Sequence, residues 1–163
     1  MSEDRVRKVV VLGDPEVGKT ALLRRFVDDE YREEYRPTPG AMPWKKRVRV
    51  DDTELNIVFW DLGGRTLSFY PAHMSDSEGA ILVCDLSRPA TVDSLADWHS
   101  ALRRKAGDVP AIVIASKSDM RPWICDVTTA ARMGLEVFPA SAKTGEGVGE
   151  AFAALLERLP RDD

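Results

Sequence analysis

The sequence lacks the features that mark several large classes of protein. Its 163 residues include two cysteines, Cys84 in an apolar run and Cys125 far along the chain, so it offers no disulfide framework and no metal-ligand spacing. No apolar run approaches the roughly 20 residues that cross a membrane. The formal net charge of −4 lacks the basic excess that nucleic-acid binding usually needs. We therefore expect a cytoplasmic protein with no nucleic-acid partner.

Signals for lipid attachment are missing from the sequence as given. Residue 2 is not the glycine that myristoylation requires, and the last five residues contain no cysteine for prenylation. We expect no direct lipid anchor, an expectation that fails if the native protein has a longer tail. With 44% hydrophobic residues and dispersed charge, residues 1–163 should form one globular domain, and we expect a monomer.

One stretch organises the rest of the chain: residues 13–20, GDPEVGKT. It follows the apolar run 9–12, which predicts a buried strand, and precedes residues 21–27, whose apolar spacing predicts a helix. Two glycines five apart, followed by Lys19 and Thr20, match the phosphate-binding P-loop, whose backbone N–H groups surround phosphate oxygens at a helix N-terminus. Lys19 would reach the outer phosphates, and the Thr20 hydroxyl would ligate their magnesium ion. The alternative is a simple glycine turn, but the motif lies between strand and helix as its mechanism requires.

The remaining hydrophobic pattern predicts alternating strands and helices, and therefore a parallel α/β sheet covered on both faces. After the first strand, we expect strands at 45–50, 55–60, 80–84, 111–115 and 136–138, and helices at 91–106, at 127–133 and from residue 146 onward. Residues 28–42 should be loop. Residues 51–53 are short enough to join the first two of these strands as an antiparallel hairpin, and residues 61–64, DLGG, should break the second sharply.

The strand at 45–50 places Lys45, Arg47 and Arg49 on one face. Such a face fits either a charged edge strand protected from aggregation or a binding surface.

Four of the expected strands end in polar residues, and ligands of such sheets bind beyond the carboxyl ends of the strands. The first strand ends in the P-loop. The third ends in Asp61, which could hold magnesium through a water, while Gly64 lets its N–H approach a terminal phosphate. Aspartate is common at strand ends, so this assignment depends on the P-loop upstream.

The last two strands lead into segments that indicate guanine. In residues 116–119, the Asp119 carboxylate can accept two hydrogen bonds from the N–H and NH2 groups on one edge of guanine, an edge that adenine lacks. In residues 140–145, the Ala142 N–H could bond the guanine carbonyl oxygen. Taken alone, residues 116–119 could equally be a solvated turn.

With these motifs on one chain, the sequence resembles the Ras-like small GTPases, in particular the Ras and Rab branches. The matching motifs are GDPEVGKT, YRPT at 35–38, DLGG at 61–64, SKSD at 116–119 and ASAK at 140–143, in the order of the family. The resemblance implies the three-layer P-loop NTPase fold, with a six-stranded, mostly parallel sheet and about five helices. It also implies a GDP/GTP cycle with Mg²⁺, and effector, exchange-factor and activating proteins that bind through two switch regions.

The resemblance further assigns roles to single residues. Thr38 would ligate magnesium in the GTP state, Tyr31 would pack on the guanine, and Tyr35 would close over the phosphates. Lys117 would lie along the base plane, and catalysis would involve Lys19, Thr38, Gly64 and Arg65. The implied metal set is Thr20, Thr38 and Asp61. The implied nucleotide-binding set is Asp14, Pro15, Glu16, Val17, Gly18, Lys19, Thr20, Ala21, Tyr31, Tyr35, Thr38, Gly64, Ser116, Lys117, Asp119, Met120, Ser141, Ala142 and Lys143.

The sequence also departs from the family at positions near the chemistry. Arg65 stands where the family has its water-orienting glutamine, and a guanidinium has hydrogen-bond donors only. Pro15 and Glu16 replace small P-loop residues, and Ser116 replaces the asparagine of the guanine motif, which could remove one bond to the base or the P-loop. We therefore expect slow GTP hydrolysis.

Three functions are consistent with these residues. The first is a slow GTP-hydrolysing switch, and the second is a non-cycling GTPase-like scaffold held in one nucleotide state. The third, a P-loop ATPase or nucleoside kinase, is disfavoured by the paired guanine motifs.

Overall fold

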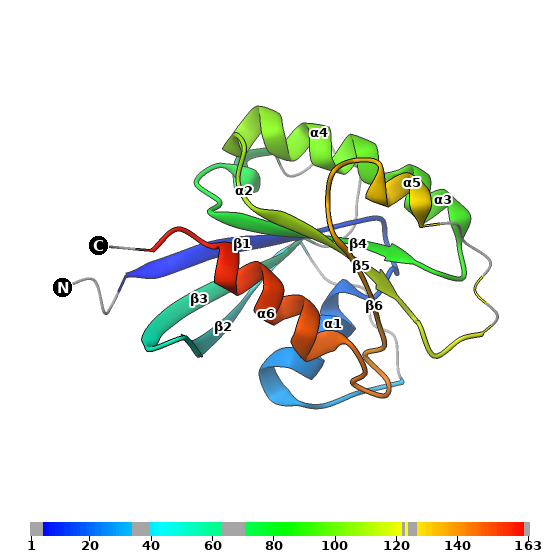
Figure 1. Ribbon diagram of the computed structural model, residues 1–163, viewed down its shortest axis with the longest axis horizontal. Coiled ribbons are helices and arrows are strands. Elements are labelled where there is room, and N and C mark those ends of the chain that lie inside the picture. Colours follow the sequence, from blue (N-terminus) through cyan, green and yellow to red (C-terminus); the bar gives the residue numbers. More distant parts are fainter. Residues whose placement is uncertain (1–4, 34–39, 63–70, 122, 124–126, 162–163) are drawn as a thin grey trace.

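The computed structural model describes residues 5–33, 40–62, 71–121, 123 and 127–161. In this part of the chain, six strands form one sheet in the order β2-β3-β1-β4-β5-β6, in which only the β2 and β3 pair is antiparallel. Helices cover both faces, with α1 and α6 on one side and α3, α4 and α5 on the other (Figure 1). The predicted three-layer α/β fold with a six-stranded, mostly parallel sheet is confirmed.

The strands alternate with short helices along the chain. The strands are β1 Val6–Leu12, β2 Ala41–Val50, β3 Thr53–Leu62, β4 Gly79–Asp85, β5 Ala111–Ser116 and β6 Val137–Ala140. The helices are α1 Lys19–Asp28, α2 Pro71–Met74, α3 Pro89–Asp93, α4 Leu95–Ala106, α5 Thr128–Ala131 and α6 Val148–Arg158.

The alternation of side chains along β1 divides the core into two layers. Val9 and Val11 pack with the layer under α1 and α6, whereas Val10 and Leu12 pack with the layer under α4. Phe26 of α1 stacks on Phe152 of α6 with ring centroids 4.1 Å apart. Because every residue of β4 is buried, the centre of the sheet is apolar on both faces, as the sequence predicts.

The hairpin of β2 and β3 is longer than the sequence predicts. The prediction that residues 41 and 42 are loop is wrong, and β3 extends through Asp61 and Leu62, the first two of the four residues expected to break it. The ladder continues to the pair of Ala41 with Leu62, and Asp61 and Leu62 are buried within β3. The ladder therefore runs two pairs beyond residue 60, Met42 with Asp61 and Ala41 with Leu62.

The helix boundaries also differ from the prediction. The expected helix at 91–106 is two segments that meet at Ser94, whose hydroxyl donates to the Ala90 carbonyl at 3.1 Å. The first segment begins earlier, with Pro89 at the first helical position. The last helix begins at Val148 and not near Glu146, because Gly147 holds a left-handed φ of 79° directly before it.

The basic strand β2 is an edge of the sheet. Arg47 and Arg49 are exposed and approach Glu54 of β3 at 3.8 and 3.7 Å. This placement fits the charged-edge interpretation. Within the residues described, no helix has both the length and the apolar character needed to cross a membrane.

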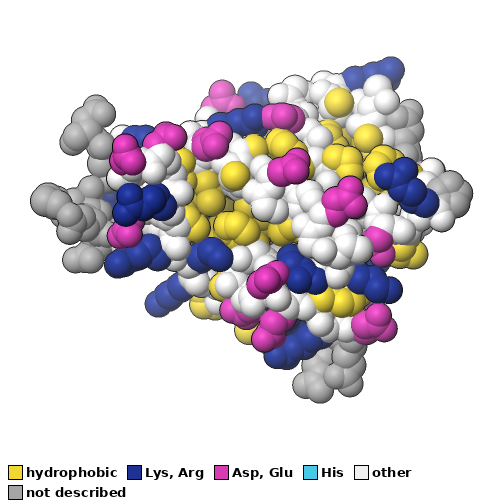
Figure 2. Space-filling model, turned by 60° about the horizontal axis from the view of Figure 1, so that its bottom comes forward, with side chains coloured by type: hydrophobic (Ala, Val, Ile, Leu, Met, Phe, Trp, Pro, Cys, Tyr) yellow, Lys and Arg dark blue, Asp and Glu magenta, His cyan; other side chains and the backbone are white. Residues whose placement is uncertain are grey.

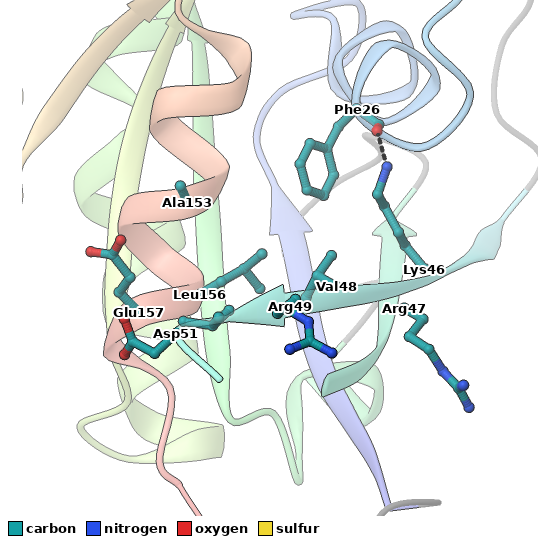
Figure 3. Close-up of a pocket in the computed structure, with 10 residues that line it drawn as sticks. Phe26, Lys46, Arg47, Val48, Arg49, Asp51, Ala153, Leu156 and Glu157 are labelled. Carbon is teal, nitrogen blue, oxygen red and sulfur yellow. Dashed lines mark hydrogen bonds between the residues drawn. The ribbon is translucent and has the colours of Figure 1, made fainter. Parts of the chain in front are cut away.

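A pocket of about 420 Å³ lies between β2 and the helices α1 and α6 (Figure 3). Phe26, Val48 and Leu156 supply apolar walls, and Lys46 donates to the Phe26 carbonyl at 2.8 Å. The space-filling view of this side of the molecule shows apolar side chains between charged ones (Figure 2). The pocket extends to Asp51 in the turn after β2, so it lies away from the loops that follow β1, β5 and β6.

Candidate nucleotide site

The loops with the sequence motifs meet at one edge of the sheet. β1 leads into the P-loop, residues 13–18, and β3 carries Asp61 next to it. β5 leads into residues 117–120, and β6 leads into residues 141–145. Since β3, β1, β4, β5 and β6 run parallel, their carboxyl ends form one continuous rim (Figure 1). This is the position where ligands of such sheets bind.

The P-loop needs its first glycine for packing. A Cβ at Gly13 would lie 2.4 Å from the Val83 carbonyl oxygen of β4. The loop then turns through two left-handed residues, Glu16 at φ 64° and Gly18 at φ 105°, before α1 begins. Backbone turns of this kind direct successive N–H groups into a shared concavity that suits an anion.

The carbonyl groups of the P-loop point to donors in the protein. The Lys19 ammonium donates to the carbonyls of Gly13 and Asp14 at 2.9 and 2.8 Å. Three further donors are supplied by residues distant in sequence: Arg88 to Pro15 at 2.9 Å, Lys117 to Glu16 at 3.4 Å, and the Ser116 hydroxyl to Val17. Each of these five consecutive carbonyls therefore has a protein donor within reach, and together the donors orient the loop.

Lys19 is 5% exposed, and its burial lowers the pKa of the ammonium to about 8. Asp61 and Asp14 oppose that shift, and Arg88 adds to it. An anionic ligand would stabilise the charged form of this buried ammonium, because its negative charge replaces the favourable interaction with water that burial removes.

Thr20 and Asp61 place two hard oxygen groups beside Lys19. The Thr20 hydroxyl donates to a carboxylate oxygen of Asp61 at 2.5 Å, and Asp61 is fully buried. Magnesium is usually held by one or two such protein oxygens together with substrate phosphates. The donor set therefore fits Mg²⁺ bound jointly with a nucleotide.

The two guanine segments are joined to each other. A carboxylate oxygen of Asp119 accepts from the Ser141 hydroxyl at 2.7 Å, and the Ser141 oxygen accepts from the Thr144 N–H at 3.1 Å. The Gly145 N–H closes the second turn on the Ser141 carbonyl at 2.7 Å. Asp119 and Ala142, which the sequence assigns to one base, therefore belong to one assembled structure.

Ser116 keeps a contact with the P-loop despite replacing asparagine. Its hydroxyl lies within hydrogen-bond distance of the Val17 and Cys84 carbonyls, the latter at 2.8 Å. A hydroxyl has one proton, so it donates to one of these carbonyls at a time.

Arg25 of α1 is a site residue that sequence reasoning missed. Its guanidinium donates to the carbonyls of Ala142 and Lys143, both at 2.8 Å, and pairs with Asp29 at 3.1 Å. This fork ties the guanine segment at 141–145 to the helix that follows the P-loop. No local signal distinguishes Arg25 from an ordinary helix-surface arginine, because the two carbonyls that it binds lie more than a hundred residues away.

Asp85, Arg88 and Trp98 were missed as well. The fully buried Asp85 carboxylate accepts from Lys117 at 2.6 Å and from Arg88 at 3.0 Å, and the Trp98 indole donates to Asp14 at 3.0 Å. Burial alone would raise the pKa of Asp85, but hydrogen bonds from Lys117, Ser87 and Arg88 outweigh it and hold the pKa below its usual value. Asp85 ends an apolar strand, which is the signal that singled out Asp61.

The other predicted residues divide into two groups. Tyr31 and Met120 are exposed near the rim, and Lys143 approaches Glu33 at 3.6 Å. Ala21 lies in the first turn of α1. Tyr35, Thr38, Gly64 and Arg65 lie outside the described residues, so the structure does not place the predicted switch contacts.

Comparison with known proteins agrees with the motifs. Residues 8–161 match the model of the Ras family. The GTP-binding protein ypt5 of Schizosaccharomyces pombe is 32% identical over 96% of this chain and 79% of its own length. GTP-binding protein YPT53 of Saccharomyces cerevisiae is 30% identical, over 94% of this chain and 76% of its own, and the human Ras-related protein Rab-7L1 is 27% identical, over 99% and 86%. The chain therefore belongs to the Ras family of small GTPases.

Proposed function

We propose that this chain is a guanine-nucleotide switch that cycles between GDP and GTP and hydrolyses GTP slowly without a partner. The observation that supports the proposal most strongly is the joined site at the rim of the sheet. There the P-loop carbonyls bind protein donors, and the Asp119 and Ser141 segments are hydrogen-bonded to each other. One nucleotide could engage both parts.

Selection of guanine rests on Asp119 and the Ala142 N–H. Adenine would cover both groups without pairing them, and a polar group covered without a partner costs about 1–3 kcal/mol, more if it is charged. The thermal shift with GDP should therefore exceed that with ADP, since a ligand of the folded state stabilises it. Equal shifts would contradict the proposal, and the nucleotide extracted from purified protein gives an independent test.

We propose that Mg²⁺ binds with the nucleotide through Thr20, with Asp61 acting through a water and Thr38 joining in the GTP form. The hydroxyl and carboxylate oxygens of Thr20 and Asp61 support this assignment. A chelator should then accelerate release of bound nucleotide. An unchanged release rate would remove magnesium from the proposal.

Slow hydrolysis is proposed from Arg65 and Pro15. Arg65 cannot accept a hydrogen bond from an attacking water, and Pro15 is exposed, with its carbonyl bound to Arg88. A ring there would crowd the approach of an arginine to the phosphate. Single-turnover hydrolysis should change little in Arg65→Ala and gain modestly in Arg65→Gln. A steep loss of rate in Arg65→Ala would show that Arg65 itself stabilises the transition state.

The second candidate is a GTPase-like scaffold that holds one nucleotide without converting it, and the same two residues favour it. The single-turnover assay separates the two functions, because a scaffold would show no conversion of bound GTP. In either function we propose a cytoplasmic monomer. Effector, exchange-factor and activating proteins would contact the two switch regions.

A further inference from the structure

Two residues outside the sequence motifs, Asp85 and Arg88, connect three separate parts of the site. Asp85 ends β4, Arg88 lies in the turn before α3, and the P-loop follows β1, the strand that pairs with β4. Arg88 is 40% exposed and reaches the Pro15 carbonyl at 2.9 Å, while its Nε contacts Asp85 at 3.0 Å.

The Asp85 carboxylate organises this connection. One oxygen accepts from Lys117 and from Arg88, and the other accepts from the Ser87 N–H at 2.8 Å and the Ser87 hydroxyl at 2.6 Å. Thr91 braces the same turn by accepting from the Asp85 N–H at 2.9 Å and donating to the Arg88 carbonyl at 2.7 Å. The carboxylate therefore holds two cations whose other contacts are consecutive carbonyls of the P-loop, those of Pro15 and Glu16.

These two carbonyls flank the left-handed turn at Glu16. If the Pro15 carbonyl loses its donor, the peptide that follows it can rotate, and with it the Glu16 N–H. Its orientation toward a phosphate is then no longer fixed. Ordering a loop in advance strengthens binding, because less conformational freedom is lost when the ligand arrives.

We propose that Asp85 and Arg88 are positioning residues that hold the P-loop in its phosphate-binding form, so that they slow the release of guanine nucleotides through the β-phosphate and not through the base. This inference rests on the proposed function. It concerns two side chains that should contact no part of the nucleotide.

The test measures dissociation constants for GDP and GMP, which differ by the phosphate that the P-loop surrounds. Arg88→Met should weaken GDP binding about tenfold, the effect of losing one charge-assisted hydrogen bond, and weaken GMP binding much less. Asp85→Asn should reduce the preference for GDP over GMP as Arg88→Met does, and it should also weaken both nucleotides together, because it releases Lys117, which is expected to lie along the base. Arg104→Met, an exposed arginine of α4, is the matched control and should leave both constants unchanged.

A general loss of folding would lower both affinities equally, so the GDP to GMP ratio separates positioning from stability. Arg88→Lys keeps the positive charge and one donor nitrogen, and it should retain part of the GDP affinity that Arg88→Met loses. An unchanged ratio in Arg88→Met, whether both affinities fall together or neither falls, overturns the inference. A wild-type protein that binds ADP as tightly as GDP overturns the proposed function instead.

Discussion

In the phosphate half of the site, residues 13–20, long cationic side chains from distant elements bind the carbonyls of one loop. In the half proposed to bind the base, residues 116–120 and 141–145, hydroxyl and amide groups join two loops over short distances, and Arg25 ties the second loop to α1. The phosphate half should therefore respond to changes of charge and pH. The base half should respond to the loss of particular hydrogen bonds, with little dependence on pH.

The largest effect is expected from Lys19→Met. It removes the donor to two P-loop carbonyls and the cation that would face the phosphates. Loss of two charge-assisted hydrogen bonds should weaken GDP binding by at least about a hundredfold. Competition binding against a fluorescent GDP measures it, with the exposed Lys105→Met as control. A loss of similar size for GMP would remove the distinction between the halves.

Asp119→Ala should weaken GDP and GMP by the same factor, roughly 10- to 100-fold, because both share the base. Binding of ADP should not change, so the preference for guanine should fall. Isothermal titration with the three nucleotides gives the comparison, and Asp52→Ala, at an exposed turn, is the control. If Asp119→Ala weakened GDP far more than GMP, this residue would belong to the phosphate half.

The pH dependence should follow Lys19. Its pKa is about 8 without ligand, and phosphate should raise it, so binding above pH 8 takes up a proton. Affinity for GDP should then be constant at lower pH and decrease by about tenfold between about pH 7 and pH 9. Titrations across this range, repeated with Lys19→Met, provide the test. A variant that kept the same decrease would show that another group titrates.

The smallest effect is expected from Arg25→Met, roughly three- to tenfold weaker binding of GDP and GMP alike. Its loss frees the carbonyls of Ala142 and Lys143 without altering any direct contact to the base. Asp29→Asn is the matched control, because asparagine tolerates the left-handed φ of 54° at this position and the change removes the charge of an exposed ion pair, and such pairs contribute little. Stopped-flow release of a fluorescent GDP resolves changes of this size, and equal rates in the two variants would leave Arg25 without a positioning role.

The sequence predicts the sheet and the P-loop well, because both depend on patterns within short segments. The apolar run 80–84 is long enough to identify a doubly buried strand, and the glycines at 13 and 18 have a fixed relation to the helix that follows. Boundaries were less accurate where tertiary contact decides them, as in the extension of β3 through Leu62.

The side chains that hold the loops were not predictable in the same way. Arg25, Arg88 and Trp98 occupy ordinary helix or turn positions, and only the folded chain brings them to carbonyls or carboxylates far away in sequence. Asp85 is the exception. Asp85 ends an apolar run, and this position could have marked it as a site residue in the same way as Asp61.

The direction of β1 has a practical consequence for immobilising the protein or fusing it to a partner. β1 begins at Val6 and needs seven residues, a rise of roughly 20 Å, to reach the P-loop. Leu159, just beyond α6, lies beside Gly79 at the start of β4, on the same edge as Val6. A tether or fusion partner joined near either of these residues would extend away from the nucleotide loops. An immobilised chain should therefore exchange nucleotide at the rate measured in solution.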